Sequence, residues 1–309
     1  MFSRGCPFNC QFCSSKEMWK RTYRIINPEN AASQVNYFVE KGVDGFAFWD
    51  DHLTLNKKWF MKFAAKIKKE KLDIQFKCLG RADSIDEEVA RTLHEIGCRM
   101  ITLGIENGSP RILKIMNKQI TPQQSERAVA LLYKNGILST GGSIVNNPGE
   151  KPDDLTLNLK FFKKLEEKYS LVPGTPTPVI IYPGSDLERV AIMDGHLKNF
   201  RWTRRYYEKR NIIAGCSPYT PLYENIPTEH LIRYIVKESL RLKYYRLLRN
   251  LIVQMIYVGR SDFHEGLKAK MIFLLGILDC IVESPWKNKP ECIYDIFNET
   301  LGYKLRKII

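Results

Sequence analysis

Apolar residues in the first two thirds of the chain follow two alternating patterns. Short apolar runs typical of strands are each followed by a longer segment in which apolar residues recur every three or four positions, as on one face of a helix. The expected strands cover 44–50, 74–79, 99–105, 137–145 and 178–181. The expected helices cover about 28–42, 56–71, 84–97, 121–133, 153–168 and 185–193. Buried strands that alternate with amphipathic helices predict an α/β fold with a parallel sheet and crossover helices.

Each expected strand ends in a polar or glycine-rich cluster, whereas the turns from helix back to strand carry no such residues. The clusters lie at 50–52, 81–83, 106–109, 146–150 and 182–185. In barrel-like α/β folds the active site lies at the carboxyl ends of the strands. We therefore expect these clusters to share one rim of the sheet.

Three cysteines, Cys6, Cys10 and Cys13, follow one another with the spacing C-x3-C-x2-C near the start of the chain. Thiolate sulfur is a soft ligand that suits iron–sulfur clusters and zinc. Three protein ligands would leave one iron of a [4Fe–4S] cluster open to another molecule. The alternatives are a structural zinc ion or ordinary cysteines, but no nearby Cys or His supplies a fourth ligand at a zinc-ribbon spacing. We expect this loop to lie on the same rim.

Composition is that of a globular protein, because 44% of the 309 residues are hydrophobic and 27% are charged. The five other cysteines are scattered without a disulfide framework, which fits a reducing cytoplasm. No signal peptide is apparent, and the longest apolar run, 271–282, is too short for a membrane span of about 20 residues. The net charge of +14 includes a basic segment, 201–260, which would suit phosphates, an anionic membrane or a substrate carboxylate, or would simply be a solvated helical face.

The cysteine loop, Ser-Arg-Gly-Cys-Pro-Phe-x-Cys-x-Phe-Cys, resembles the signature of radical S-adenosylmethionine (radical SAM) enzymes. Within that family it is similar to the cobalamin-associated branch, which includes the anaerobic Mg-protoporphyrin ester cyclases and several methyltransferases. Five further motifs of this branch follow in order at the strand ends. They are Phe-Trp-Asp-Asp at 48–51, Arg-x-Asp at 81–83, Gly-Ile-Glu-x-Gly-Ser at 104–109, Asn-x-Pro-Gly-Glu at 146–150 and Tyr-Pro-Gly-Ser at 182–185.

The resemblance implies an incomplete (β/α)6 TIM-like barrel over residues 1–200, followed by a C-terminal helical extension over 201–309. The first barrel strand of the family precedes the cysteine loop, and the cobalamin-binding domain lies further upstream. Because this sequence begins five residues before Cys6, we expect both to be missing from it. In the extension, residues 229–257 have a helical, aromatic and basic pattern, which favours helices that cap the barrel mouth or, alternatively, a peripheral membrane contact.

The resemblance also implies the roles of the site residues. Cys6, Cys10 and Cys13 would hold the cluster, and Phe12 would lie beside the adenine of SAM. Asp50 or Asp51 would accept hydrogen bonds from the SAM ammonium, unless one of them caps the next helix.

Three further strand ends would contact SAM. Arg81 would neutralise the SAM carboxylate. Glu106 would bind the ribose hydroxyls or the ammonium, or would instead form a salt bridge with Arg81 or Arg111. Ile144 and Asn146 would flank the adenine, although Ile144 is equally a core residue by type.

The implied activity is reductive cleavage of SAM by a [4Fe–4S] cluster, followed by methyl transfer, cyclisation or other hydrogen-abstraction chemistry on an unactivated carbon. The implied partners are a flavodoxin- or ferredoxin-type electron donor and a small-molecule, lipid or tetrapyrrole-like substrate, with cobalamin held by a domain outside this sequence. Nucleic acid is not expected as a partner. The alternatives are an RNA-modifying radical SAM enzyme, and a non-catalytic basic metal-cluster protein that binds RNA or an anionic surface.

Overall fold

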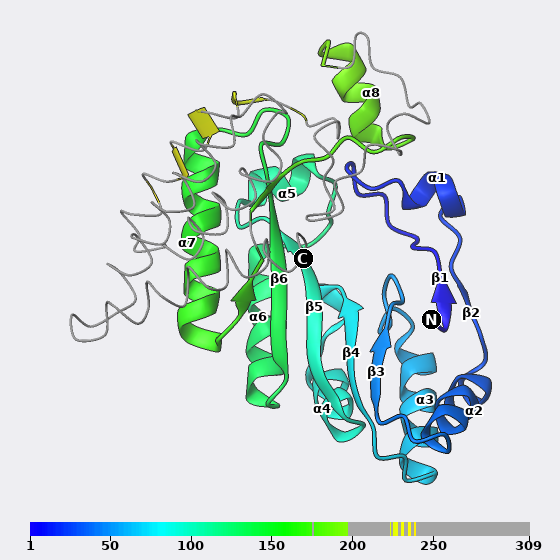
Figure 1. Ribbon diagram of the computed structural model, residues 1–309. Helices are drawn as coiled ribbons and strands as arrows, with labels where there is room; N and C mark the ends of the chain where they lie inside the picture. The colour runs from blue at the N-terminus through cyan, green and yellow to red at the C-terminus, as the bar shows by residue number, and fades with distance from the viewer. Residues whose placement is uncertain are drawn as a thin grey trace, which may run out of the picture. The chain divides into compact units, whose positions relative to one another are not determined.

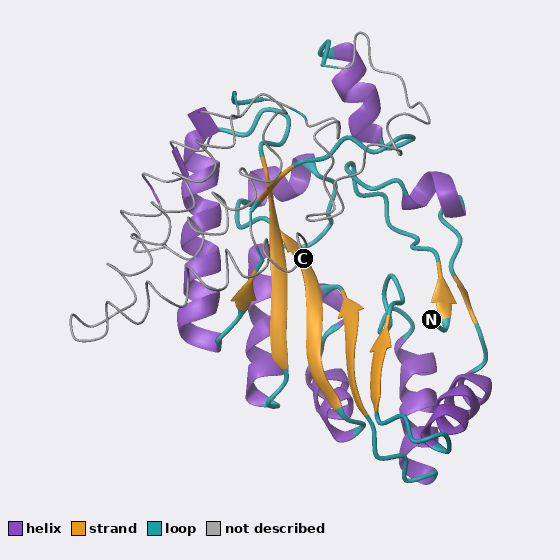
Figure 2. Cartoon of the chain, viewed as in Figure 1, coloured by secondary structure: helices purple, strands orange, loops and turns teal. Residues whose placement is uncertain are grey.

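The computed structural model describes residues 1–174, 176–196, 223, 225–227, 230–231, 234–235 and 238. A parallel sheet forms the centre of this part of the chain (Figures 1 and 2). Its strands are β3 (Gly45–Phe48), β4 (Gln75–Gly80), β5 (Cys98–Glu106), β6 (Leu138–Val145) and β7 (Val172–Pro173), hydrogen-bonded in that order, and β8 (Thr177–Pro178) also pairs with β6. The predicted α/β fold with a parallel sheet is confirmed.

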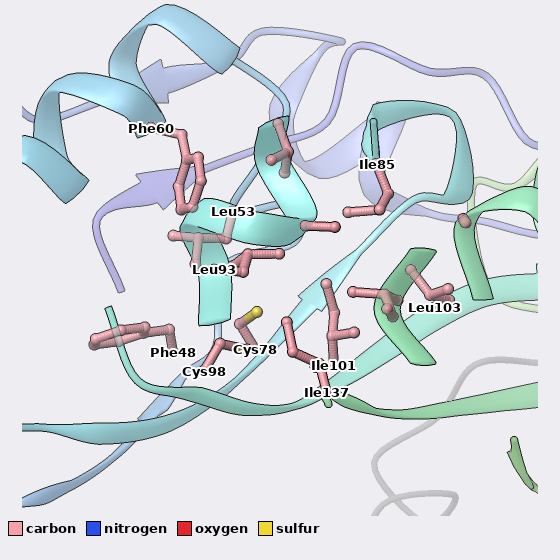
Figure 3. Close-up of a cluster of buried hydrophobic side chains, with 14 of the residues drawn as sticks. Phe48, Leu53, Phe60, Cys78, Ile85, Leu93, Cys98, Ile101, Leu103 and Ile137 are labelled. Atoms are coloured by element: carbon pink, nitrogen blue, oxygen red, sulfur yellow. The ribbon is translucent and has the colours of Figure 1, made fainter. Parts of the chain in front are cut away.

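Helices connect successive strands and pack against one face of the sheet. They are α2 (Pro28–Val39), α3 (Lys57–Lys69), α4 (Glu87–Glu95), α6 (Pro122–Lys134) and α7 (Pro152–Tyr169), with the short α5 (Pro110–Ile115) and the 3-10 turn η1 (Ala82–Ser84) near the strand ends. The core lies between the sheet and these helices, where Phe60 and Leu93 meet buried strand residues such as Ile101 (Figure 3). Burial of these apolar side chains, rather than intrinsic helix propensity, is the main source of stability of this layer.

Local sequence signals set where the helices begin. Asn27 and Asn56 each accept a hydrogen bond from the first turn of α2 and α3, and Thr121 forms a capping box with Gln124 at the start of α6. The helix expected to begin at about residue 84 begins three residues later. Ser84 belongs to η1, and α4 is instead capped by Asp86.

The segment before the cysteine loop forms a separate two-stranded antiparallel sheet. Strand β1 (Ser3–Arg4) pairs with β2 (Arg24–Ile25) and does not join the ladder of β3. Phe2 nevertheless packs on the edge of the main core, with its ring centre 5.0 Å from that of Phe48. The segment is therefore anchored beside β3 through side chains.

The C-terminal end of the described region bears on two further expectations. Helix α8 (Asp186–Met193) confirms the helix predicted over about 185–193, and Ser185 caps it. The proposed extension over 201–309 lies almost wholly outside the described residues, and so does most of the expected helical and membrane-contacting segment, 229–257. Among the helices that are described, none is both long enough and apolar enough to cross a membrane.

Candidate functional site

The cysteine loop connects β1 to the short helix α1 (Ser15–Trp19) and lies against the carboxyl end of the sheet. Backbone hydrogen bonds hold it from two sides: Gln11 N donates to the Met116 carbonyl at 2.8 Å, and Leu187 N donates to the Gln11 carbonyl at 2.9 Å. The side chain of Asn117 also donates to the Asn9 carbonyl at 2.7 Å. The loop is thus placed on the rim by the α5–α6 connection and by α8.

All three cysteines of the loop are free thiols; Cys10 is buried, and Cys6 and Cys13 are half-buried. Burial raises the thiol pKa of Cys6 and of Cys13, and the neighbouring cysteine sulfurs raise both further. Within the described residues, no three Cys, His, Asp or Glu side chains are arranged around a single metal ion.

The donor set fits an iron–sulfur cluster. Thiolates around one zinc ion would lie about 3.8 Å apart, given Zn–S bonds of about 2.3 Å in a tetrahedron. A cubane cluster binds each thiolate to a different iron, so it accepts three sulfurs from one loop at wider separations. The cluster also stabilises the thiolate form, which offsets the raised thiol pKa values.

Arg81 follows β4 and is buried beneath the cysteine loop. Its guanidinium forms two 3.0 Å hydrogen bonds with the Asp83 carboxylate, donates to the Lys118 carbonyl at 2.9 Å and lies 3.9 Å from Cys10 Sγ. Its carbon centre is 3.6 Å from the centre of the Phe8 ring, a close cation–π contact. Arg81 is therefore placed to position the loop, and its donors are already engaged where a SAM carboxylate was expected to bind.

The two carboxylates after β3 occupy different environments. Asp50 is fully buried; its Oδ1 accepts hydrogen bonds from the backbone of Phe2 and Ser3 and from the Ser3 hydroxyl, whereas its Oδ2 is buried without a partner. Asp51 is exposed, and neither carboxylate caps α3. An unpaired buried carboxylate oxygen is costly. Asp50, rather than Asp51, therefore has the free acceptor that an ammonium group requires.

Glu106 at the end of β5 is paired with Lys118, whose ammonium lies 2.7 Å from its carboxylate. The expected alternative partners are wrong, because Arg81 binds Asp83 and Arg111 binds Asp154. Lys118 also lies 5.8 Å from the centre of the Phe12 ring. The buried Lys118 side chain therefore lies beside both Glu106 and Phe12.

Lys118 itself was not among the sequence candidates. It lies twelve positions after the strand end, in the connection between α5 and α6, so the strand-end rule does not find it. Lys118 is close to the cysteine loop in space but far from it in sequence, so no pattern in the sequence identifies it.

Two strand-end residues, Glu106 and Asn146, have left-handed backbone conformations, with φ of 65° and 62°. Such conformations cost free energy in non-glycine residues and are concentrated at functional sites. The amide of Asn146 both donates to and accepts from the Ile226 backbone, at 2.9 and 2.7 Å, so its side chain anchors that segment. Ile144 is half-buried, and its carbonyl accepts hydrogen bonds from Asn107 and Asn147. Its side chain packs against the main core and against a second cluster of buried side chains, which consists of Val179, Ile181, Leu187, Ala191 and Tyr223.

His52, next to the Asp pair, is buried rather than solvated. Its Nε2 lies 2.9 Å from the Ser84 hydroxyl. Burial, followed by the nearby Arg81 charge, lowers the pKa of His52 to about 4. The imidazole is therefore neutral near pH 7 and adds no charge to the rim.

The fold and the site define an α/β protein whose rim combines a three-cysteine loop with carboxylates at the strand ends. Residues 1–162 match the radical SAM superfamily. The chain belongs to this superfamily, whose members are enzymes that use a [4Fe–4S] cluster and SAM.

Individual relatives agree with this assignment. An uncharacterized methyltransferase of Pyrococcus horikoshii is 38% identical over 208 residues, which are 67% of this chain and 44% of the relative. The anaerobic magnesium-protoporphyrin IX monomethyl ester cyclase of Rubrivivax gelatinosus is 32% identical over 157 residues, which are 50% of this chain and 28% of that protein. The chain thus spans less than half the length of these two relatives.

A solved structure shares the fold. The radical SAM methyltransferase TsrM from Kitasatospora setae, determined with cobalamin and a [4Fe–4S] cluster bound, superimposes with a TM-score of 0.56 at 20% sequence identity. The match covers 62% of this chain and 36% of TsrM. This likeness supports a partial barrel of the radical SAM type.

Proposed function

We propose that this chain forms the catalytic partial barrel of a radical SAM enzyme that acts on an unactivated carbon of a small molecule, by methyl transfer or cyclisation. The observation that carries the proposal is the joint placement, on one rim, of three free cysteines and a buried carboxylate oxygen that lacks a partner. The family resemblance of the strand-end motifs extends the same assignment to the rest of the rim.

Cys6, Cys10 and Cys13 would hold the cluster, and Arg81 would keep their loop in place through Phe8 and the Lys118 carbonyl. When bound, such a cluster would supply the one-electron reduction that cleaves SAM. Phe8 and Phe12, which lie within the cysteine loop, would help to exclude water from the reacting atoms.

The remaining rim residues would bind and orient SAM. Asp50 Oδ2 would accept from the ammonium group, and Lys118 would take the carboxylate that we had expected Arg81 to bind. Glu106, freed in part from Lys118, would accept from the ribose hydroxyls. Ile144 and Phe12, which pack together with the same cluster of apolar side chains, would lie on either side of the adenine.

The electron donor would dock on the basic surface formed by Arg4 and Arg24. These two exposed residues lie directly opposite each other in the β1–β2 pair. Like charges at such positions destabilise a strand pair, so their juxtaposition favours an acidic partner. The surface adjoins the cysteine loop, which fits a flavodoxin or ferredoxin that must approach the cluster.

Anaerobic reconstitution with iron and sulfide tests the proposal. We expect about four irons per chain and release of 5′-deoxyadenosine from SAM after reduction. Replacing Cys6, Cys10 and Cys13 together by Ala should abolish both, whereas Cys78→Ala, which removes a thiol outside the loop, should keep the iron. Stoichiometric zinc without sulfide would contradict the proposal. The contacts of the described residues add no support to the RNA-modifying or RNA-binding alternatives, which remain predictions.

A further inference from the structure

Trp49 and Lys77 lie on the face of the sheet opposite the helix layer. Side chains alternate between the two faces of a strand. Phe48 and Cys78 are buried under the helices, so the residues next to them point to the open face. Trp49 is 59% exposed, and the Lys77 ammonium lies 5.5 Å from the centre of its ring.

The strand register places other side chains around this pair. Lys77 is level with Ala47 on one side and Met100 on the other, and Met100 is level with Leu138. The row above contains Leu79, Thr102 and Thr140. Both rows are uncharged apart from Lys77, and the two threonine hydroxyls are hydrogen-bonded to each other, so this part of the open face combines an uncharged surface with one cation.

Lys77 has no carboxylate partner within the part of the chain that the structure describes. Its recorded contact is the cation–π interaction with Trp49, which orients the ammonium without neutralising it. The carboxylate of Glu106, at the end of the neighbouring strand β5, is already paired with Lys118. An anionic group on a ligand would therefore meet Lys77 without competition from a carboxylate of the described residues.

The pair also lies close to the proposed SAM site. Trp49 immediately precedes Asp50, and Lys77 lies three positions before the end of β4, or about 10 Å along the strand at 3.3 Å per residue. The Lys77 ammonium lies beside the Trp49 ring, so a ligand bound to both would lie next to the end of β3 that leads into Asp50.

We propose that Trp49 and Lys77 form a substrate subsite for a flat, conjugated ring system that carries a carboxylate. Trp49 stacks against the ring system, and Lys77 pairs with the carboxylate at its edge. This inference rests on the proposed function, because it places the reacting carbon beneath SAM.

Titration with protoporphyrin IX, which has two free carboxylates, and with its dimethyl ester tests both parts of the subsite. Reconstituted full-length chain should bind the free acid at least tenfold more tightly than the ester. Lys77→Met should weaken binding of the free acid about tenfold and leave the ester unaffected, and Lys77→Arg should retain the preference. Trp49→Leu should weaken both ligands. The matched control Lys62→Met, an exposed position on α3, should change neither.

Equal binding of acid and ester by the wild-type chain, equal affinities in all variants, or no saturable binding would overturn the subsite. Far-UV circular dichroism identifies any variant that has lost its fold. Wild-type chain that releases 5′-deoxyadenosine but binds no porphyrin would overturn this inference alone. Chain that binds porphyrin but cleaves no SAM would instead overturn the proposed function.

Discussion

The ammonium group of Lys118 lies 2.7 Å from the carboxylate of Glu106, and both side chains are largely buried at the end of β5. Ion pairs of this kind contribute little net stability, because desolvation offsets the attraction, but either member left alone is costly. In the proposed SAM site the two members bind different groups, with the SAM carboxylate on Lys118 and the ribose hydroxyls on Glu106.

Lys118→Met should therefore destabilise the fold by about 1–3 kcal/mol and weaken SAM binding at least tenfold. Each single variant, Lys118→Met or Glu106→Gln, leaves the other member of the pair as a buried unpaired charge, whereas the double variant leaves none. The stability loss of the double variant should therefore be smaller than the sum of the two single losses. Urea unfolding and equilibrium SAM binding measure the two effects. Additive stability losses would show that the pair is not coupled.

Asp50→Asn should keep the fold, because an Asn carbonyl can still accept from the backbone of Phe2 and Ser3. It removes the charged oxygen that has no partner, so we expect SAM binding to weaken at least tenfold. Asp51→Asn is the matched control and should change SAM affinity less than twofold, because Asp51 is exposed. The reverse order of effects would assign the ammonium to Asp51.

Arg81→Lys should release the cysteine loop. Lysine cannot reproduce the bidentate contact with Asp83 together with the bond to the Lys118 carbonyl. Reconstituted protein should therefore lose iron several-fold faster during gel filtration. The visible absorbance of the iron–sulfur cluster measures this loss. Arg91→Lys, at an exposed position on α4, should retain iron like the wild type. Equal retention by both variants would remove the positioning role of Arg81.

Burial raises the pKa of Glu150 to about 7, against the ordinary 4.5, despite hydrogen bonds from Asn147 and Asn107. The folded state then binds this proton more tightly than the unfolded state. Its contribution to stability is complete below about pH 4.5 and is lost as the pH rises through about 7. The nearby charged groups, Asp154 and Arg111, are paired with each other.

Glu150→Gln should therefore flatten this part of the pH profile. Between pH 5 and pH 8 the wild type should lose about 2–3 kcal/mol more stability than the variant. Urea unfolding at four pH values provides the measurement. Parallel profiles for the two proteins would mean that Glu150 stays ionised in the fold.

Arg4→Glu combined with Arg24→Glu should slow the SAM cleavage that is driven by reduced flavodoxin about tenfold or more at low salt. Because dithionite needs no docking surface, the rate with dithionite should fall much less. Lys58→Glu with Lys62→Glu, at exposed positions on α3, serves as the control of equal charge change. An equal loss with both reductants would point to damage of the cysteine loop instead.

Sequence reasoning predicts the strands and the rim because both depend on local signals. The apolar runs that become β4, β5 and β6 are continuous, and each ends in a polar cluster at Arg81, Glu106 or Asn146. Parallel strands bring such ends together whatever the details of packing. The predicted strand 178–181 was less regular, since Pro178 is its only residue within β8 (Thr177–Pro178).

The hydrogen-bond and ion-pair partners of each rim side chain could not be predicted in the same way. Arg81 was expected to be free for a carboxylate, but Asp83, two residues away, already binds it. Asn146 was expected at the adenine, but its amide is bonded to Ile226, eighty positions later. These contacts join elements that are distant in sequence or compete for one donor, so spacing alone does not reveal them.

The carboxylate of Asp50 connects two events that would otherwise be independent. One oxygen accepts hydrogen bonds from Phe2 and Ser3, and the other is buried without a hydrogen-bond partner. A ligand on the unpaired oxygen could change how tightly residues 2–3 are bound to Asp50. Thermodynamic linkage then requires that a partner that binds residues 2–3 changes the affinity for that ligand by the same factor. A partner that binds the chain just before the cysteine loop would thereby change the affinity for SAM without contacting SAM itself.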